Sequence, residues 1–143
     1  MPVSSNVRPQ TQTSPRAMQL NQVTVPAVDV KQSVEFYCGL GLRLIVNALP
    51  RYARLECPDG GSTFSLHQVN KRPAPSDVVV YFECQDLDAK VIQLQSSGYT
   101  FQQEPIDESW LWREARLFEP SGNVICLFKA GENRRNPPWR LLE

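Results

Sequence analysis

The sequence of 143 residues has little of several features that would place it in a large functional class. It has one histidine, and its four cysteines form no Cys-x-x-Cys pair, which argues against a zinc knuckle or a disulfide framework. Fifteen basic and fifteen acidic residues cancel, so the basic surface that nucleic acids or anionic membranes require is missing. The longest apolar runs, such as residues 78–82, are too short to cross a bilayer, and residues 1–17 lack the apolar stretch of a secretory signal. We therefore expect a cytoplasmic protein with reduced thiols, with no nucleic acid and no membrane among its partners.

The two ends of the chain differ in composition from the part between them. Residues 1–17 are rich in Pro, Ser, Thr and Gln, so we expect a flexible N-terminal tail. Residues 131–143 contain three arginines and the run NPPW at 136–139, which excludes regular structure. Because an exposed tryptophan is unfavourable, we expect this C-terminal segment to dock over a cavity or against a partner subunit. Residues 18–130 are sufficient for one packed domain.

Hydrophobic periodicity divides residues 18–130 into two stretches with the same order of elements, one strand, one helix and three further strands. In the first stretch the expected elements are a strand at 20–26, a helix at 30–40 and strands at 42–46, 52–56 and 63–69. In the second stretch they are a strand at 78–84, a helix at 87–96 and strands at 99–103, 110–118 and 124–130.

Turn and cap residues recur at fixed distances along the chain. Asp29 and Asp86 each stand where a helix N-cap is expected, and they are 57 positions apart. The Pro-x-Gly turns at 58–60 and 120–122 are 62 positions apart. Two sets of matching positions indicate an internal repeat of a β-α-β-β-β unit. Two such units placed side by side would enclose a cavity between their sheets.

Three stretches also resemble a known family. LNQVTVPAVDVKQSVEFYCGLGL (20–42) and VVVYFECQDLDAKVIQLQSSGYTF (78–101) resemble the module openings of the vicinal oxygen chelate superfamily. RLFEPSGNVICLF (116–128) resembles its closing strand pair. This superfamily includes glyoxalase I, bleomycin-resistance proteins, fosfomycin-resistance enzymes and extradiol dioxygenases. The resemblance implies an α+β fold of two βαβββ modules, about 18–70 and 77–130, in a glyoxalase-like barrel or cleft. It also implies a homodimer, with the modules paired within one chain or between two.

The resemblance further implies metal ligands at four inward positions, on the first and last strand of each module. These positions are Gln22, Ser65, Val79 and Cys126, with Ser65 turned inward because its apolar neighbours suit the helix side. Hard divalent ions prefer carboxylate and imidazole ligands, which none of these four residues supplies. We therefore expect no cofactor and no standard metal site. The alternative is a divalent metal ion held by Gln22, His67 and Cys126.

Strand alternation predicts which other side chains face the cavity. Trp112, Glu114 and Arg116 share one face of their strand, and Tyr81 faces inward on a neighbouring one. A charged pair on an inward face is costly unless the two charges satisfy each other or bind a ligand, and both readings stay open. His67 is the only imidazole in the chain, so we consider it either as a general base or as a structural residue.

These patterns predict a protein that binds a small anionic or aromatic molecule between its modules. One alternative is a metal-dependent lyase, isomerase or transferase of the glyoxalase type, and another is a drug-sequestering resistance protein. The predicted ligand-binding residues are Gln22, Ser65, Tyr81, Trp112, Arg116 and Cys126, and the predicted catalytic residues, should the protein be an enzyme, are His67 and Glu114.

Overall fold

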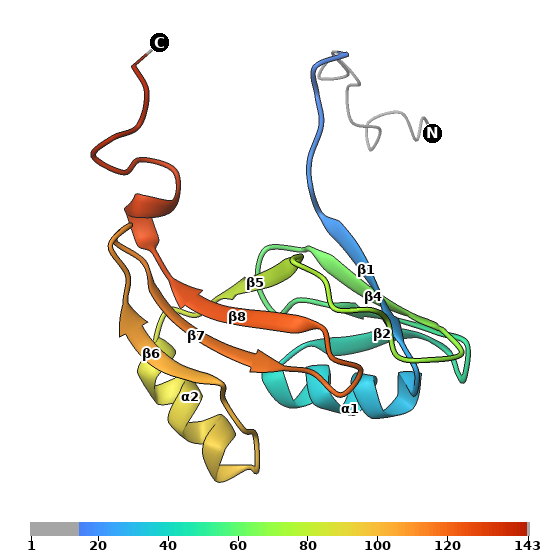
Figure 1. Ribbon diagram of the computed structural model, residues 1–143. Coiled ribbons are helices and arrows are strands. Elements are labelled where there is room, and N and C mark those ends of the chain that lie inside the picture. The colour runs from blue at the N-terminus through green and yellow to red at the C-terminus, as the bar shows by residue number, and fades with distance from the viewer. Residues whose placement is uncertain (1–14, 143) are drawn as a thin grey trace, which may run out of the picture.

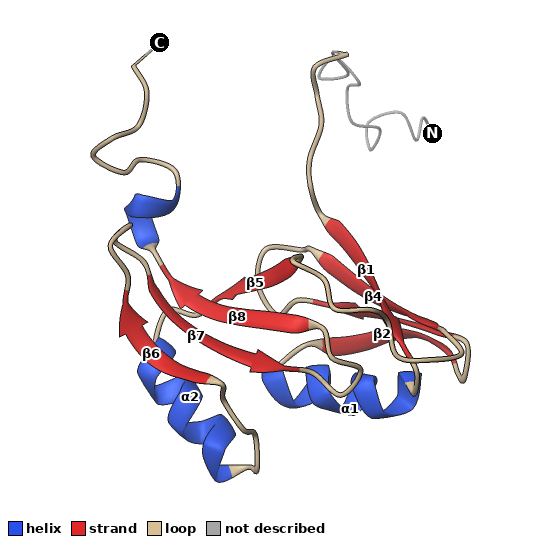
Figure 2. Ribbon diagram, viewed as in Figure 1, coloured by secondary structure: helices blue, strands red, loops and turns tan. Residues whose placement is uncertain are grey.

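A computed structural model describes residues 15–142, and it shows two βαβββ modules in sequence (Figures 1 and 2). The first module contains β1 (Gln22–Ala27), α1 (Val30–Leu40), β2 (Arg43–Ala48), β3 (Tyr52–Glu56) and β4 (Thr63–Gln68). The second contains β5 (Val79–Glu83), α2 (Leu87–Ser96), β6 (Gln103–Asp107), β7 (Arg113–Phe118) and β8 (Val124–Lys129). The predicted α+β fold and its internal repeat are confirmed.

Each module forms a mixed four-stranded sheet with the same topology. The strand orders are β1-β4-β3-β2 and β5-β8-β7-β6, and the first strand of each module runs parallel to the last. The remaining neighbours are antiparallel. A parallel pair needs a crossover connection, and the helix of each module lies in the crossover that separates its first and last strands. The first and last strands therefore lie side by side in both sheets.

The two helices begin and end in different ways. The Asp29 side chain accepts a hydrogen bond from the Gln32 backbone amide, which caps α1 as the sequence predicts. At the other end Gly41 adopts a left-handed conformation with φ of 119°, which a side chain would disfavour. Asp86 occupies the matching N-cap position of α2, but its side chain makes no cap hydrogen bond. The repeat therefore preserves the helix position without preserving the capping contact.

One continuous hydrophobic core joins both modules on the helix side of the sheets. Leu55, Phe64 and Leu66 are at most 2% exposed and pack in this core with α1. Ser65 lies between the two buried apolar residues of β4 and points to the opposite face, where it contacts Gln22. This placement confirms the predicted register of β4, because a shift by one residue would have exchanged the two faces.

A buried carboxylate links the two modules at the turn between β7 and β8. Glu119 accepts hydrogen bonds from the Ser33 and Tyr37 hydroxyls of α1 and from the Ser121 and Asn123 backbone amides. The Asn123 side chain also donates to the Pro26 carbonyl at 2.9 Å. Burial and the neighbouring carboxylate raise the pKa of Tyr37, so its hydroxyl stays a hydrogen-bond donor. The modules are thus fixed relative to each other by specific polar contacts as well as by the shared core.

Two predicted strands differ from the structure. The strand expected at 99–103 is wrong, because β6 begins only at Gln103. Tyr99 instead packs against Phe36 of α1 and donates a hydrogen bond to the Phe36 carbonyl. The segment around Tyr99 is therefore positioned by contacts with α1 and not by pairing with a strand of the sheet. The strand expected at 110–118 is too long, because Leu111 has a positive φ of 69° in a turn and β7 begins at Arg113.

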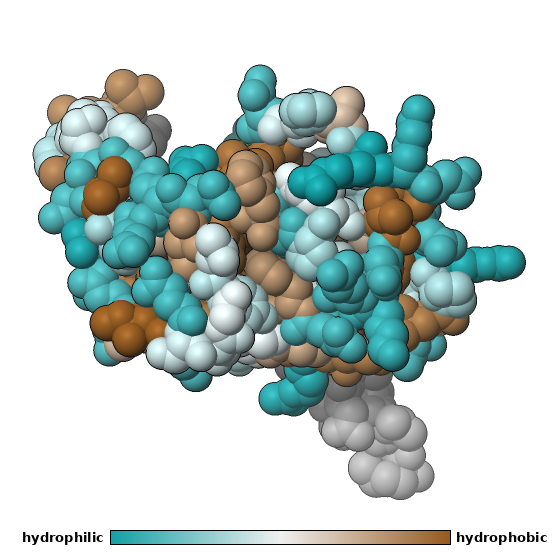
Figure 3. Space-filling model, turned by 60° about the horizontal axis from the view of Figure 1, so that its bottom comes forward, coloured by the Kyte–Doolittle hydropathy of each residue, from teal (hydrophilic) through white to brown (hydrophobic). Residues whose placement is uncertain are grey.

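The two α-helices, α1 and α2, lie on one side of the two sheets, and the opposite faces, called the helix-free faces below, carry no α-helix (Figure 1). The segments that lead to the two chain ends rise from this helix-free side. The helix side shows hydrophilic side chains with hydrophobic areas between them (Figure 3). Among residues 15–142, neither helix has the length and apolar composition needed to cross a membrane.

The predicted terminal segments are described only in part. Most of the predicted N-terminal tail, residues 1–14, lies outside the described residues. The C-terminal segment begins with a short 3-10 helix, Gly131–Arg134, which is held in place by Glu83: that carboxylate accepts the Ala130 and Gly131 amides. The Asn133 carbonyl accepts from Trp112 Nε1 at 3.2 Å, and farther along Trp139 is 56% exposed. Docking of this segment over a cavity or on a partner subunit stays a prediction.

Candidate functional site

The helix-free face of the first module carries a connected set of polar side chains. The Gln22 amide donates to Ser65 Oγ at 2.9 Å, and Ser65 Oγ lies 2.7 Å from Tyr52 Oη. Arg54 Nε donates to the same Tyr52 oxygen at 2.9 Å, and the guanidinium lies 5.6 Å from the centre of the Tyr52 ring. Three strands of one sheet, β1, β3 and β4, thus contribute to a single network.

The direction of these hydrogen bonds follows from what each group can donate. Ser65 is fully buried, and Tyr52 Oη is the only acceptor recorded for its hydroxyl within residues 15–142. We therefore assign the Ser65 hydrogen to Tyr52, which then accepts two hydrogen bonds, one from Ser65 and one from Arg54. The hydrogen bond from Ser65, and then that from Arg54, lower the pKa of Tyr52 below its ordinary value. The Tyr52 hydroxyl itself is left as a donor for another molecule.

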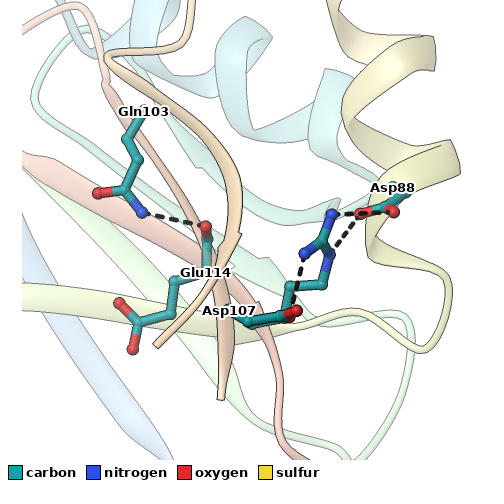
Figure 4. Close-up of polar contacts among 5 residues, drawn as sticks. Asp88, Gln103, Asp107 and Glu114 are labelled. Carbon is teal, nitrogen blue, oxygen red and sulfur yellow. Dashed lines mark hydrogen bonds and ion pairs between the residues drawn. The ribbon is translucent and has the colours of Figure 1, made fainter. Parts of the chain in front are cut away.

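The helix-free face of the second module is organised around a buried glutamate. Glu114 is 1% exposed; one carboxylate oxygen accepts from Trp110 Nε1 at 2.7 Å and the other from Arg116 at 3.1 Å. Its neighbour Arg113 points to the other face of β7 and binds Asp88 of α2 and Asp107 of β6. Figure 4 shows the Glu114 carboxylate turned away from Asp88 and Asp107, while the Gln103 side chain donates to the Glu114 carbonyl. Because side chains alternate along β7, Arg113 lies on the helix side and Glu114 on the helix-free side.

Three aromatic rings lie beside this glutamate. Trp112 stacks on Phe128 with ring centres 4.7 Å apart, and Tyr81 meets both rings edge-on at 5.9 and 5.5 Å. Arg116 donates to the Tyr81 hydroxyl and lies 5.9 Å from the centre of its ring. We call Tyr81, Trp112 and Phe128 the aromatic wall. Tyr81 is 42% exposed, whereas Phe128 is 4% exposed and Trp112 Nε1 donates to the Asn133 carbonyl at 3.2 Å, so Tyr81 is the edge of the wall that a ligand can reach from solvent.

Cys126 lies in the same part of the second sheet and is completely buried. Burial and, next, the Glu114 carboxylate raise the pKa of its thiol to about 12. The thiol is therefore protonated at neutral pH, and a protonated buried thiol is a poor nucleophile and a poor metal ligand. Its contribution to the site is limited to packing under the more exposed side chains.

A groove separates the two modules where the edge strands β1 and β5 approach each other. Its volume is about 1030 Å³, and both modules contribute to its walls. Two of the predicted ligand-binding residues, Gln22 and Tyr81, line it from opposite sides. The groove therefore reaches the edge of the polar network at Gln22 and the edge of the aromatic wall at Tyr81, and its remaining walls come largely from α2 and the β3–β4 turn.

Comparison with known proteins agrees with this architecture. A family model described as the glyoxalase/bleomycin resistance protein/dioxygenase superfamily matches residues 19–127. The chain belongs to this superfamily. An uncharacterized protein of Mycolicibacterium smegmatis is 26% identical over 111 residues, which cover 77% of this chain and 92% of that protein.

Two solved structures show the same superfamily fold. A glyoxalase/bleomycin resistance protein/dioxygenase from Nocardioides has a TM-score of 0.71 and 23% identity, with 93% of this chain and 95% of that chain covered. A bleomycin-binding protein in complex with bleomycin has a TM-score of 0.63 and 19% identity, with 79% of this chain and 98% of that chain covered. At these identities the similarity establishes the fold alone.

The four metal positions of the superfamily do not suit a divalent ion in this member. Val79 has no donor atom, and the Cys126 thiol is buried and protonated. The Ser65 hydroxyl is engaged with Tyr52, and the Gln22 amide oxygen accepts the Thr63 hydroxyl. Within residues 15–142 no three His, Cys, Asp or Glu side chains are grouped so as to hold a metal ion. A hard cation would therefore find neither the charge nor the imidazole that it prefers.

His67 lies at the end of β4, opposite Tyr52 of β3 in the strand pairing, and its side chain is exposed. It is not among the residues that line the groove. A role for His67 in catalysis stays a proposal, as does the role of Glu114, whose two carboxylate oxygens are already bound.

Tyr52 and Arg54 were not among the predicted site residues, although the repeat contains a signal for them. Arg54 pairs with Ser65 across β3 and β4, and Arg116 pairs with Cys126 across β7 and β8. Arg54 and Arg116 are 62 positions apart, the same distance as the matching Pro-x-Gly turns. Extending the repeat from the turns into the strands would have identified Arg54 as the counterpart of Arg116.

Proposed function

We propose that this superfamily member binds a small aromatic or anionic molecule between its two modules and that it does so without the standard divalent metal. The observation that carries the proposal is the replacement of the metal ligands. The positions that would hold the ion are aliphatic, buried or bound to other side chains, while the aromatic wall, with Tyr81 exposed, packs beside the two positions of the second module, Val79 and Cys126. Aromatic side chains with a few polar groups are typical of small-molecule sites.

Binding without turnover is the form of this function that the side chains favour. Neither Glu114 nor Cys126 is prepared for chemistry, because the glutamate is held by two donors and the thiol is protonated. If a proton is transferred, we assign the step to His67, since Glu114 would have to lose one of its two donors before it could take up a proton. The fold similarity to a bleomycin-binding protein supports drug sequestration as a second candidate. A metal-dependent lyase, isomerase or transferase is disfavoured by the same donor set.

We further propose a cytoplasmic homodimer. The terminal segments leave Leu20, Leu141 and Leu142 at least 89% exposed on a chain whose helix-free faces are open. Apolar side chains at this exposure are covered in many proteins by a second subunit, which would also close the open faces over a ligand. Light scattering on the purified protein tests this arrangement, and a mass of one chain over the micromolar range would contradict it.

The proposed function is tested by binding and by metal analysis on protein purified without a histidine tag. Isothermal titration calorimetry with phenylphosphonate, benzoate and bleomycin is expected to give binding that Trp112→Ala weakens about tenfold or more. Ile92→Ala is the control, because this residue of α2 is 64% exposed and lies outside the aromatic wall and outside the terminal segments. Tyr81→Ala provides a second test with little structural cost, since Tyr81 is 42% exposed. A stoichiometric metal ion in elemental analysis, or equal affinities in all variants, would refute the proposal.

A further inference from the structure

The two helix-free faces carry equivalent arginines in different electrostatic surroundings. Arg116 has a carboxylate partner, because Glu114 lies two residues away on the same face of β7 and binds it at 3.1 Å. The position equivalent to Glu114 in the first module is Tyr52, 62 residues earlier. Arg54 therefore has a neutral phenol where Arg116 has a negative charge.

No other acidic residue compensates the charge of Arg54 within residues 15–142. Its cross-strand neighbours are Val46 on β2 and Ser65 on β4, and neither is charged. Glu56, two residues farther along β3, is paired with Arg43 of β2 at 3.1 Å. The first module thus presents an exposed positive charge that has no ion-pair partner in the described part of the chain.

The hydrogen bonds of Arg54 leave most of its donors available. Only Nε is used, in the bond to Tyr52, and no acceptor within residues 15–142 is recorded for the two terminal nitrogens. The bond through Nε and the contact with the Tyr52 ring also restrict the orientation of the guanidinium. An arginine fixed at one nitrogen presents its remaining donors as a fork, which matches two oxygens of a carboxylate or phosphate group.

Tyr52 adds a donor next to this fork. Its oxygen already accepts from Ser65 and Arg54, so its own hydrogen is directed to another acceptor. Ser65 is in turn held by Gln22, which places the tyrosine in a network that spans three strands. Two donors of this kind, two residues apart on one face of β3, suit an anion and not a cation.

We propose that Arg54 and Tyr52 form an anion-binding subsite on the first module and that it takes the carboxylate or phosphonate group of the ligand. This inference deepens the proposed function and rests on it, since the remainder of the ligand would lie against the aromatic wall. The second module offers no equivalent subsite, because Glu114 neutralises Arg116. The ligand class is therefore an aromatic acid, bound in one orientation.

The test uses inorganic phosphate and phenylphosphonate as probes in calorimetric titrations of the full chain at constant ionic strength. Arg54→Gln is expected to weaken binding of phenylphosphonate at least about tenfold, which corresponds to about 1.4 kcal/mol. Arg51→Gln makes the same charge change on the neighbouring turn and is expected to change the affinity less than about twofold. Arg54→Lys is expected to fall between the wild type and Arg54→Gln, because lysine keeps the charge but not the fork. Tyr52→Phe, which removes one neutral donor, is expected to weaken binding about threefold to tenfold.

The two probes separate this inference from the proposed function. Phosphate binding that depends on Arg54 but not on Trp112, together with phenylphosphonate binding that depends on both, supports both statements. Equal phosphate affinity in the wild type and in Arg54→Gln, or no binding of either probe, overturns the subsite. Phenylphosphonate binding that depends on Arg54 but not on the aromatic wall supports the subsite and overturns the aromatic part of the proposed function. Circular dichroism spectra of all variants establish that they are folded.

Discussion

Replacement of Glu119 by alanine is expected to destabilise the whole domain, because this carboxylate joins the two modules. Its oxygens accept from the Ser33 hydroxyl at 3.2 Å, the Tyr37 hydroxyl at 3.3 Å and the Asn123 amide at 3.2 Å, and also from the Ser121 amide. Glu119 is 2% exposed. Removing the carboxylate leaves four donors without their acceptor in a place that water reaches poorly.

The size of the effect follows from these contacts. A hydrogen bond to a charged group contributes about 1.5–3 kcal/mol, and each orphaned donor costs about 1–3 kcal/mol. The two hydroxyls can turn toward other acceptors and a water molecule can enter the space, so we expect a loss of about 3–5 kcal/mol and not the full sum. Such a loss is about a third of the stability of an ordinary domain.

Equilibrium unfolding in urea, followed by far-ultraviolet circular dichroism at one protein concentration, measures this loss. With a slope of about 2 kcal/mol/M, the midpoint is expected to fall by about 2 M. Glu35→Ala is the control on α1, since Glu35 is exposed, and it is expected to change the stability by less than about 0.5 kcal/mol. A loss below about 1 kcal/mol for Glu119→Ala would show that the hydrogen bonds do not hold the modules together.

Three further predictions concern packing, thiol reactivity and the pH dependence of stability. Gly39→Ala would place a methyl group against the Tyr99 hydroxyl, so we expect it to lower the free energy of unfolding in urea by about 1–3 kcal/mol. In a Tyr99→Phe background, which lacks the hydroxyl, the same substitution should lower it by less. An equal loss in both backgrounds would contradict the clash. Cys126 should react with a thiol reagent at pH 8 only after unfolding, whereas the exposed Cys38 reacts in the folded protein. Because its pKa is raised from 9.0 to about 12 in the folded state, the stability that Cys126 contributes is complete below pH 9 and falls as the pH rises toward 12. Cys126→Ser should reduce that alkaline loss, and an unchanged loss would argue against burial of the thiol.

Much of the fold could be predicted because the physical signals for it are local. Period-two alternation marked β3 at its observed bounds of Tyr52–Glu56, and the Asp29 cap and Gly41 terminus delimited α1. The fixed spacing of caps and turns then predicted two equal modules. The misplaced strand before Gln103 was not predictable in this way, since Tyr99 is directed by its contact with Phe36 of the other module.

The sequence by itself determined the architecture and the poor set of metal ligands, because residue types and alternation are written along the chain. It placed Gln22 and Ser65 on one face and excluded a site built from several histidines. Only the tertiary structure decided which charges are free. Glu114 and Arg116 neutralise each other, whereas Arg54 has Tyr52 in the equivalent position and no carboxylate partner within residues 15–142. The strand register decided that Glu56 pairs with Arg43 and not with Arg54. Such pairings depend on distances of a few ångströms between strands, which the order of residues does not specify.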